Sequence, residues 1–416
     1  MNKKPILYFL DFICDCSTNT GVQRVSRSLA KALMEMGHDL LFVRWNEKEK
    51  SLRIASQEEV RVLERWNGPK VSKWSGLAKH PLKANVAKLL HMSSFLEEVR
   101  GGWLLVPEVT HITNLSYAPT DEMINYAKQM SMKTAFVFYD AIPFKLDEYS
   151  EMKEKHVKYM QDIALADLIL PISKFSGDDL RKYYCEHLFF DENTLPSIVP
   201  ISLAGELSSI KRVLNYEEPS EKERIILSVG TIESRKNQTT LLDAFNQLCL
   251  KDPTLNLDLV FVGNLHPLIA PSLNRAMKLN SRIKYLKYVA DEELDTLYKK
   301  ALFTVFPSVE EGFGLPIIES LWHCKPAIFA NFGAMAEIAD EGGCLAVDVR
   351  KKKELADAIE KLVSNAELCL ELGKQTTTRR IKMWGDYATE IVESLKLHAD
   401  PISKLNKLFY LTDHTC

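Results

Sequence analysis

The feature that most constrains the fold is a repeated alternation of short apolar runs with helical patterns. Near-continuous apolar runs of this kind are typical of strands buried on both faces of a parallel sheet. The segments between them carry apolar residues at helical spacing, as expected for helices that cover such a sheet. The first series of runs lies at 5–12, 39–45, 103–107, 134–140 and 167–173. This pattern predicts a doubly wound α/β domain.

A second series of runs follows a loop rich in Pro, Ser and Glu at 217–223. A helix is expected between its first two runs, from Gln238 to Leu250. The runs lie at 224–230, 257–264, 283–289, 301–308 and 325–331. With 416 residues the chain is long enough for two cores. We therefore expect domains at 1–205 and 206–385, followed by a helical segment at 386–416.

Charge and cysteine usage exclude several classes of protein. The formal net charge is only −3, so no nucleic-acid partner is expected. The 8 cysteines lack metal-ligand spacing and are interpreted as reduced thiols of a cytoplasmic protein without a metal site. The N-terminus resembles a signal peptide, but Asp11 and Asp15 interrupt its apolar run, which favours a buried first strand.

The clearest candidate site is the segment at 307–321, where a strand is followed by a glycine-containing loop and a helix. Gly312 and Gly314 allow a ligand to approach the backbone, and Pro316 suits the first turn of a helix. The N-terminus of that helix presents free N–H groups and a partial positive charge. The segment is therefore expected to bind an anion such as a diphosphate.

Two carboxylates frame this turn: Glu311 precedes it, and Glu319 lies in the first turn of the helix. Because they would repel a phosphate, they are better suited to accept hydrogen bonds from sugar or ribose hydroxyls. The alternative is that they only complement the helix dipole, which is the preferred interpretation for Glu310.

A second candidate lies where the run at 224–230 ends. Arg235 and Lys236 follow Gly230 in a short loop before a helix, and adjacent cations there can neutralise a diphosphate. Such pairs are common on solvated surfaces. The occurrence of this pair in the same domain as the carboxylate turn favours binding.

The segment EGFGLPIIE is similar to the E-x7-E signature of the group 1 retaining glycosyltransferases, which have the GT-B fold. The resemblance implies two Rossmann-like domains facing a central cleft, with the last helical segment crossing back to the N-terminal domain. It also implies that Glu311 contacts the donor sugar and Glu319 the ribose. The backbone of Phe313, Gly314 and Leu315 would then lie against the sugar and diphosphate.

The loop with the two cations resembles the family pattern VG-x-x-x-x-RKN, which implies that Arg235 and Lys236 bind the diphosphate. Many members carry a further Arg where this chain has Thr231, so contact at that position is doubtful. Further donor-binding positions implied by the resemblance are Gly230, Gly263, Gly312, Tyr288 and Val289, the last two beside the nucleobase.

In the first domain the resemblance implies that Gly21 and Val22 face the donor. Gln23 and Arg24 are expected near the cleft and Arg27 on the outer face of the helix.

Many relatives have His-Asp at the end of the run at 134–140, where this chain has Tyr139 and Asp140. Tyr139 and Ser173 are expected on the acceptor side, and Asp140 in contact with acceptor or donor sugar. Asp140 could equally be a turn residue before Ile142.

The implied reaction moves a hexose from a nucleotide diphosphate sugar to a glycan or lipid-linked glycan, as in bacterial surface polysaccharide and O-antigen biosynthesis. The implied catalytic residues are Asp140, Glu311, Arg235 and Lys236. No cofactor or metal is expected, because the cations and the helix N-terminus can stabilise the leaving group. Likeness to mannosyl- and rhamnosyltransferases ranks GDP-mannose first among donors.

Alternatives remain. The basic stretch from Lys70 to Lys88 suits peripheral membrane association and, equally, a solvated loop and helix. A dinucleotide oxidoreductase would need a G-x-G-x-x-G loop that the first turn lacks. A nucleotide-sugar epimerase or a non-catalytic glycan- or nucleotide-sugar-binding protein on the same fold stays open.

Overall fold

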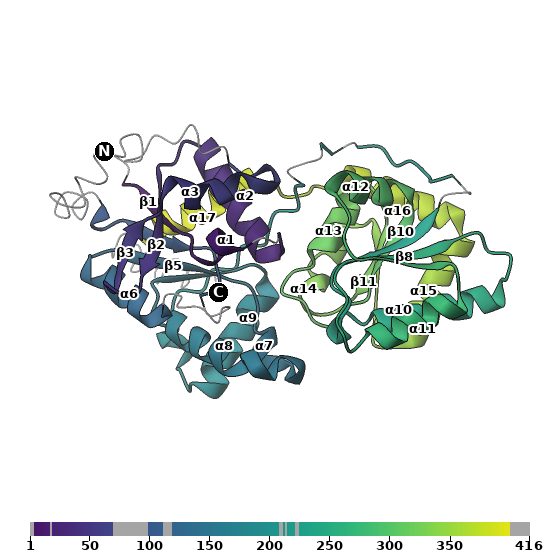
Figure 1. Cartoon of the computed structure of the whole chain (residues 1–416), viewed down its shortest axis with the longest axis horizontal. Coiled ribbons are helices and arrows are strands. Elements are labelled where there is room, and N and C mark those ends of the chain that lie inside the picture. Colours follow the sequence, from purple (N-terminus) through teal and green to yellow (C-terminus); the bar gives the residue numbers. More distant parts are fainter. Residues whose placement is uncertain are drawn as a thin grey trace, which may run out of the picture. The chain divides into compact units, whose positions relative to one another are not determined.

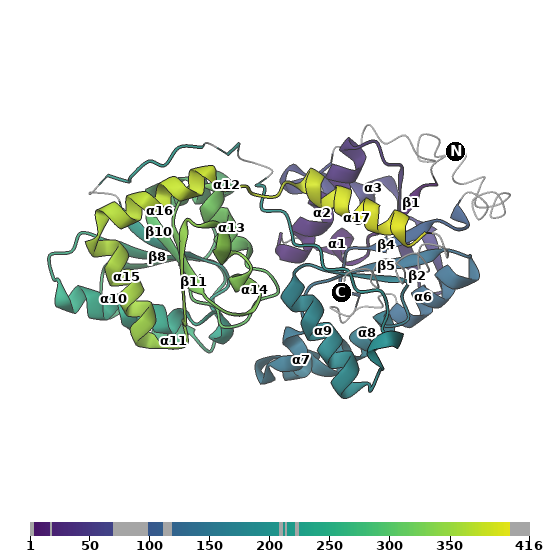
Figure 2. The same cartoon turned by 180° about the vertical axis from the view of Figure 1, so that it is seen from behind.

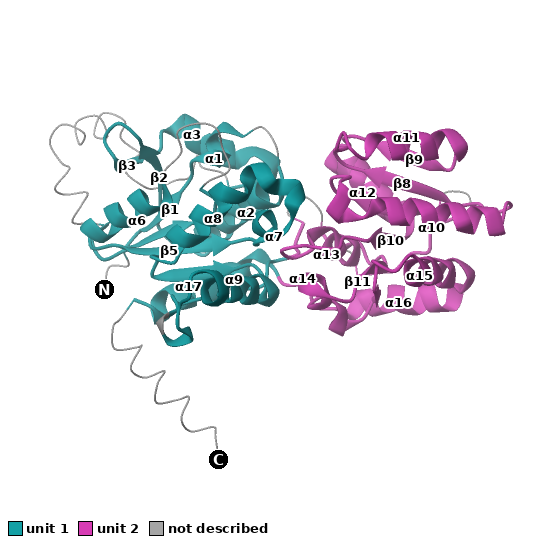
Figure 3. Cartoon of the chain, turned by 90° about the horizontal axis from the view of Figure 1, so that it is seen from below, with its two compact units in different colours: residues 1–204, 383–416 teal, residues 205–382 magenta. Residues whose placement is uncertain are grey.

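The computed structural model describes residues 4–16, 19–69, 99–110, 119–207, 211–212, 214–220 and 224–399 (Figure 1). The basic stretch from Lys70 to Lys88 lies outside these residues. The chain forms two compact units: unit 1 comprises Met1–Ala204 with Met383–Cys416, and unit 2 comprises Gly205–Lys382 (Figure 3). The return to unit 1 comes three residues before the expected position of 386, because helix α17 (Trp384–Leu397) begins there and packs on α2 (Figure 2).

Unit 1 contains a six-stranded sheet in the order β3-β2-β1-β4-β5-β6. Its strands are β1 (Ile6–Phe9), β2 (Leu40–Asn46), β3 (Ser51–Ile54), β4 (Trp103–Val106), β5 (Lys133–Phe138) and β6 (Leu168–Pro171). The five predicted runs form the parallel strands. The sequence analysis missed β3, a short edge strand that pairs antiparallel with β2 and is mostly half-buried.

The helices of unit 1 that are used below are α1 (Phe12–Asp15), α2 (Gly21–Glu35), α8 (Ser150–Ile163), α9 (Lys174–His187) and the 3-10 helix η1 (Val62–Asn67). The others are α3 (Gln57–Arg61), α6 (Thr120–Gln129), α7 (Ile142–Lys145), η4 (Asp147–Tyr149) and η5 (Glu192–Thr194). Among the described residues, no helix is both long enough and apolar enough to cross a membrane.

Unit 2 contains a second six-stranded sheet, wholly parallel, in the order β12-β11-β10-β7-β8-β9. Its strands are β7 (Ile225–Val229), β8 (Asp258–Val262), β9 (Ile283–Leu286), β10 (Ala301–Phe306), β11 (Ala327–Ala330) and β12 (Cys344–Val347). Five were predicted. The edge strand β12 was missed, and all four of its residues are only half-buried.

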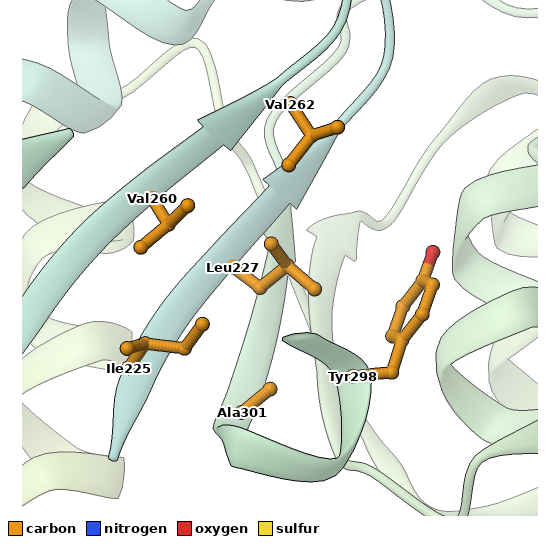
Figure 4. Close-up of a cluster of buried hydrophobic side chains, with 6 residues drawn as sticks. All are labelled: Ile225, Leu227, Val260, Val262, Tyr298 and Ala301. Carbon is orange, nitrogen blue, oxygen red and sulfur yellow. The ribbon is translucent and has the colours of Figure 1, made fainter. Parts of the chain in front are cut away.

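The unit 2 helices that bear on the site are η6 (Ser234–Lys236), α10 (Gln238–Lys251), α12 (Asp291–Lys300) and α13 (Leu315–Trp322). The remaining ones are α11 (Ala270–Leu279), α14 (Gly333–Ala336), η7 (Ala339–Glu341), α15 (Lys352–Ser364) and α16 (Ala366–Thr378). A core cluster joins the sheet to α12 and is shown in Figure 4: Ile225, Leu227, Val260, Val262, Tyr298 and Ala301.

Both sheets have the same strand order when the strands are counted within each unit, namely 3-2-1-4-5-6. The order reverses between β1 and β4 in unit 1 and between β7 and β10 in unit 2. Open α/β sheets bind ligands beyond the carboxyl ends of the two strands at such a reversal. The loops after β7 and β10 are therefore where unit 2 is expected to bind a ligand.

The loops after β7 and β8 meet backbone to backbone at two glycines. Gly230 and Gly263 have φ of +131° and +143°, and the Gly230 N–H donates to the Val262 carbonyl at 2.8 Å. A Cβ on Gly263 would lie 2.2 Å from the Gly230 carbonyl oxygen, whereas a Cβ on Gly230 would have its nearest neighbour at 4.0 Å. Only glycine fits at 263.

Replacing Gly263 by Ala should destabilise unit 2 by about 3 kcal/mol, because steric overlap adds to backbone strain. Gly230→Ala is the matched control: it has similar strain without the overlap and should cost only about 1 kcal/mol. Chemical denaturation of the full chain measures both. Equal losses would show that the close approach of the two loops has no energetic consequence.

Candidate active site

The two predicted cations lie in the loop after β7 and point toward one carboxylate in the loop after β10. Lys236 Nζ and Arg235 Nη1 both contact Glu311 Oε1, the latter at 3.1 Å. Arg235 Nη2 also lies 2.9 Å from Glu233. The Lys236 side chain is only 11% exposed, and its ammonium lies 4.7 Å from the centre of the Phe306 ring. The structure therefore brings the cation pair and the first carboxylate of the motif into direct contact.

Backbone contacts lock these two loops together. Arg235 donates to the Glu310 carbonyl, and Val309 N–H donates to the Arg235 carbonyl, each at 2.8 Å. Ser308 Oγ donates to Glu311 at 2.6 Å. Because β7 and β10 are the strands at which the sheet order reverses, the locked pair of loops forms the rim of the expected ligand crevice.

The charges at this rim are strongly coupled. Burial raises the pKa of Glu311, but attraction by Lys236 and Arg235 outweighs burial and holds that pKa below its ordinary value. For Lys236, burial is the larger effect and lowers its pKa despite Glu311. The lowered pKa of Glu311 favours the ion pair, whereas the lowered pKa of Lys236 opposes it. The direct contact of Glu311 with two cations supports an ionised carboxylate.

The turn after Glu311 has the predicted shape. Gly314 precedes α13 with φ of +116°, a conformation that favours glycine, and Pro316 lies in the first turn. Gly312 and Phe313 are buried, and Leu315 is half-buried. Glu319 does not lie in the first turn of α13 as predicted, because the helix begins at Leu315 and its first turn holds no acidic residue. Glu319 is 5% exposed and accepts a hydrogen bond from the Tyr298 hydroxyl at 2.9 Å.

The other predicted donor-binding residues of unit 2 follow the neighbouring strands β8 and β9. Gly263 contacts Gly230, Tyr288 is 83% exposed, and Val289 packs on the core cluster. The positions assigned to the donor thus follow four consecutive strands, β10, β7, β8 and β9, at one edge of the sheet.

The predicted acceptor residues of unit 1 are less accessible than expected. Tyr139 is buried and its hydroxyl donates to the Pro107 carbonyl at 2.6 Å. Ser173 is fully buried as the N-cap of α9 and accepts from Ser176 N–H at 3.0 Å. Both hydroxyls are therefore hydrogen-bonded within unit 1, and the placement of Tyr139 and Ser173 on the acceptor side stays a prediction.

Asp140 acts as a turn residue, the alternative that the sequence left open. Its Oδ1 accepts from Ile142 N–H at 3.0 Å, while the side chain stays half-buried. Gly21 is exposed as the first residue of α2, and Val22 is half-buried.

Arg27 lies inside unit 1, not on the outer face of its helix as predicted. It is 2% exposed, donates to Asn19 at 2.6 Å and lies 4.2 Å from the centre of the Trp66 ring. Its Nε and Nη2 have no hydrogen-bond partner among the residues that the structure describes. Trp66 belongs to η1, a segment distant in sequence, so the burial of Arg27 could not be inferred from the helical pattern of α2 alone.

Sequence reasoning missed Glu108, which occupies the reversal point of the first sheet. Its carboxylate accepts from the N–H groups of Asp11, Phe12 and Ile13 at 2.8–2.9 Å, at the start of α1. Burial raises the pKa of Glu108 to about 7, although the three N–H donors oppose this shift. A glutamate directly after a buried strand was the available signal.

The free energy of unfolding should depend on pH because of the raised pKa of Glu108. Because the pKa of Glu108 is about 7 in the folded chain and 4.5 ordinarily, the folded chain binds the proton more tightly. Between these values the wild type should lose stability as pH rises, by about 2–3 kcal/mol relative to Glu108→Gln. Denaturation at pH 5 and pH 8 measures this. Glu154→Gln, exposed on α8, is the control, and a pH-independent difference for Glu108→Gln would refute the raised pKa.

Glu311→Gln should destabilise unit 2 by about 3 kcal/mol, because it leaves the buried Lys236 ammonium without its counter-charge. Glu310→Gln is the matched control, since Glu310 binds Arg235 through its backbone, and it should change stability by less than about 0.5 kcal/mol. Thermal melting of both variants measures the difference in stability. Similar melting temperatures would mean that Glu311 does not compensate the cations.

Comparison with known proteins shows which family the part of the chain around this site resembles. Residues 212–379 match the family of glycosyl transferases group 1. The matched region lies within unit 2. The match includes both cations, Glu311 and Glu319, so the unit 2 residues predicted to bind the donor lie inside the matched region, whereas Gly21 and Val22 lie outside it.

Similarity to individual relatives extends over a longer part of the chain than the family match. O-antigen chain mannosyltransferase B from Escherichia coli is 25% identical over 279 residues, covering 62% of this chain and 69% of that protein. The serotype-specific mannosyltransferase WbdA from Escherichia coli is 26% identical over 220 residues, covering 50% of this chain. This chain matches only 27% of the length of WbdA.

The fold of the whole chain is similar to that of solved glycosyltransferase structures. HepE from Anabaena, solved in complex with UDP, has a TM-score of 0.63 at 14% identity, covering 94% of this chain and 99% of that one. The GT-B fold predicted from the sequence is thereby confirmed, with one Rossmann-like sheet in each unit.

Proposed function

We propose that this protein is a retaining glycosyltransferase that binds a nucleotide diphosphate sugar through unit 2 and transfers its hexose to a glycan or lipid-linked glycan. The observation that carries the proposal is the contact of Arg235 and Lys236 with Glu311 at the reversal point of the second sheet. A buried Lys236 and a half-buried Arg235 at the reversal point suit a diphosphate, and a carboxylate beside them suits a sugar hydroxyl.

In the proposed reaction the bond between the anomeric carbon and the diphosphate oxygen breaks while the acceptor hydroxyl oxygen bonds to the same carbon. The acceptor proton passes to the departing phosphate oxygen. Arg235, Lys236 and the N-terminus of α13 stabilise the charge that develops on the diphosphate, without a metal. Loss of one such group is expected to lower kcat by roughly 100- to 1,000-fold.

GDP-mannose is the proposed donor, and a bacterial surface polysaccharide such as an O-antigen is the proposed product. The support is that two relatives are named mannosyltransferases, one of them for the O-antigen chain. The UDP in HepE makes uridine nucleotides the first competitor. Unit 1 is proposed to bind the acceptor, with Asp140 as the contact that keeps partial exposure.

A thermal-shift panel of GDP, UDP, dTDP and their sugar conjugates, with EDTA present, tests the proposal. A ligand at 100 times its Kd stabilises the native state by about 2.7 kcal/mol. We expect the largest shift with GDP or GDP-mannose, and its loss in Arg235→Ala and Glu319→Ala.

Arg275→Ala is the control for that panel, because Arg275 is an exposed cation on α11 of the same unit. It should leave the nucleotide shift unchanged. A well-folded protein that responds to no nucleotide would contradict the proposal and favour a non-catalytic glycan-binding protein. A response that appears only when Mg²⁺ replaces the EDTA would contradict metal independence alone.

A further inference from the structure

Tyr298 is a buried residue that contacts Glu319, the proposed ribose contact, and it lies outside the E-x7-E motif. It lies on α12, is 1% exposed, and its hydroxyl donates to Glu319 Oε2 at 2.9 Å. Glu319 belongs to α13, so the hydrogen bond joins two helices that flank β10 in the sequence. One oxygen of the carboxylate is thus held by a residue 21 positions earlier in the chain.

The ring of Tyr298 is held from two directions. It belongs to the core cluster formed with side chains of β7, β8 and β10 (Figure 4). It also stacks on the imidazole of His323, with ring centres 4.3 Å apart and an interplanar angle of 12°. A ring packed in this way has little rotational freedom, so its hydroxyl has one accessible position.

His323 packs against α12 as well as α13. Its Nδ1 donates to the Glu319 carbonyl at 2.7 Å, and its Nε2 lies 3.2 Å from Asp295 Oδ1 on α12 without meeting hydrogen-bond geometry. The imidazole is 4% exposed. The backbone of Glu319 is therefore fixed by His323, while its side chain is fixed by Tyr298.

We propose that Tyr298 is a positioning residue, braced by His323, that holds Glu319 so that the carboxylate accepts a ribose hydroxyl of the donor nucleotide. The inference rests on the proposed function. A carboxylate offers about four acceptor sites, so it can accept hydrogen bonds from Tyr298 and from a ligand hydroxyl at the same time. A site built to bind a hydroxyl discriminates strongly against a ligand that lacks it. The hydrogen-bonded pair of Tyr298 and Glu319 should therefore make the protein selective for ribonucleotides over deoxyribonucleotides.

The test measures Kd by calorimetry for GDP, 2′-deoxy-GDP and 3′-deoxy-GDP, and for the three matching uridine nucleotides. In the wild type, removal of the contacted hydroxyl should weaken binding by roughly 10- to 100-fold. Tyr298→Phe keeps the ring in the core and removes only the hydroxyl. It should weaken ribonucleotide binding roughly tenfold and change binding of the corresponding deoxynucleotide by less than about twofold.

Tyr285→Phe is the control, because Tyr285 is a half-buried tyrosine on β9 of the same unit. It should leave every Kd unchanged. A loss in Tyr298→Phe that is equal for ribo- and deoxynucleotides would show a merely structural role and overturn this inference alone, as would an unchanged Kd. If the wild type binds none of the six nucleotides, the proposed function fails first and this inference with it.

Discussion

Lys236 and Arg235 approach the carboxylate of Glu311 from a loop that follows a different strand of the same sheet. Holding Lys236 and Arg235 away from water would cost several kcal/mol without carboxylates beside them, so Glu311, together with Glu233 on Arg235, allows both side chains to stay charged. A diphosphate would supply further negative charge to the same cations. Glu311 could then share its lone pairs with a sugar hydroxyl. One buried contact thus joins the stability of the two loops to the proposed chemistry.

The two units use the same topology differently. In unit 1 the amides beyond β1 are occupied by Glu108, a carboxylate supplied by the loop after β4. In unit 2 the corresponding loop supplies Glu311, which meets cations instead of amides. An anionic ligand at the reversal point of unit 1 would have to displace Glu108 from its hydrogen bonds. That difference supports the assignment of the phosphate-binding role to unit 2.

The sequence was sufficient for the parallel strands, because strands buried on both faces leave an uninterrupted apolar run. It was insufficient for β3 and β12, since half-buried edge strands carry mixed residues that resemble loops. The start of α13 was predictable from Gly314 and Pro316, whose backbone preferences are local. Burial of Arg27 was not, because it depends on η1, a segment distant in sequence.

The same difference between local signals and contacts of distant segments explains which features of the site could be predicted. Motif spacing placed Glu311, Arg235 and Lys236 after the correct strands, because strand ends follow from the chain pattern. Spacing says nothing about which way a side chain turns within its loop, and Tyr139 turned into the core. It also cannot show that Glu319, which is almost fully buried, is oriented by Tyr298. A carboxylate that must recognise a neutral hydroxyl needs a fixed direction more than it needs charge. The part of recognition that distinguishes one nucleotide from another therefore depends on packing, which only the folded chain reveals.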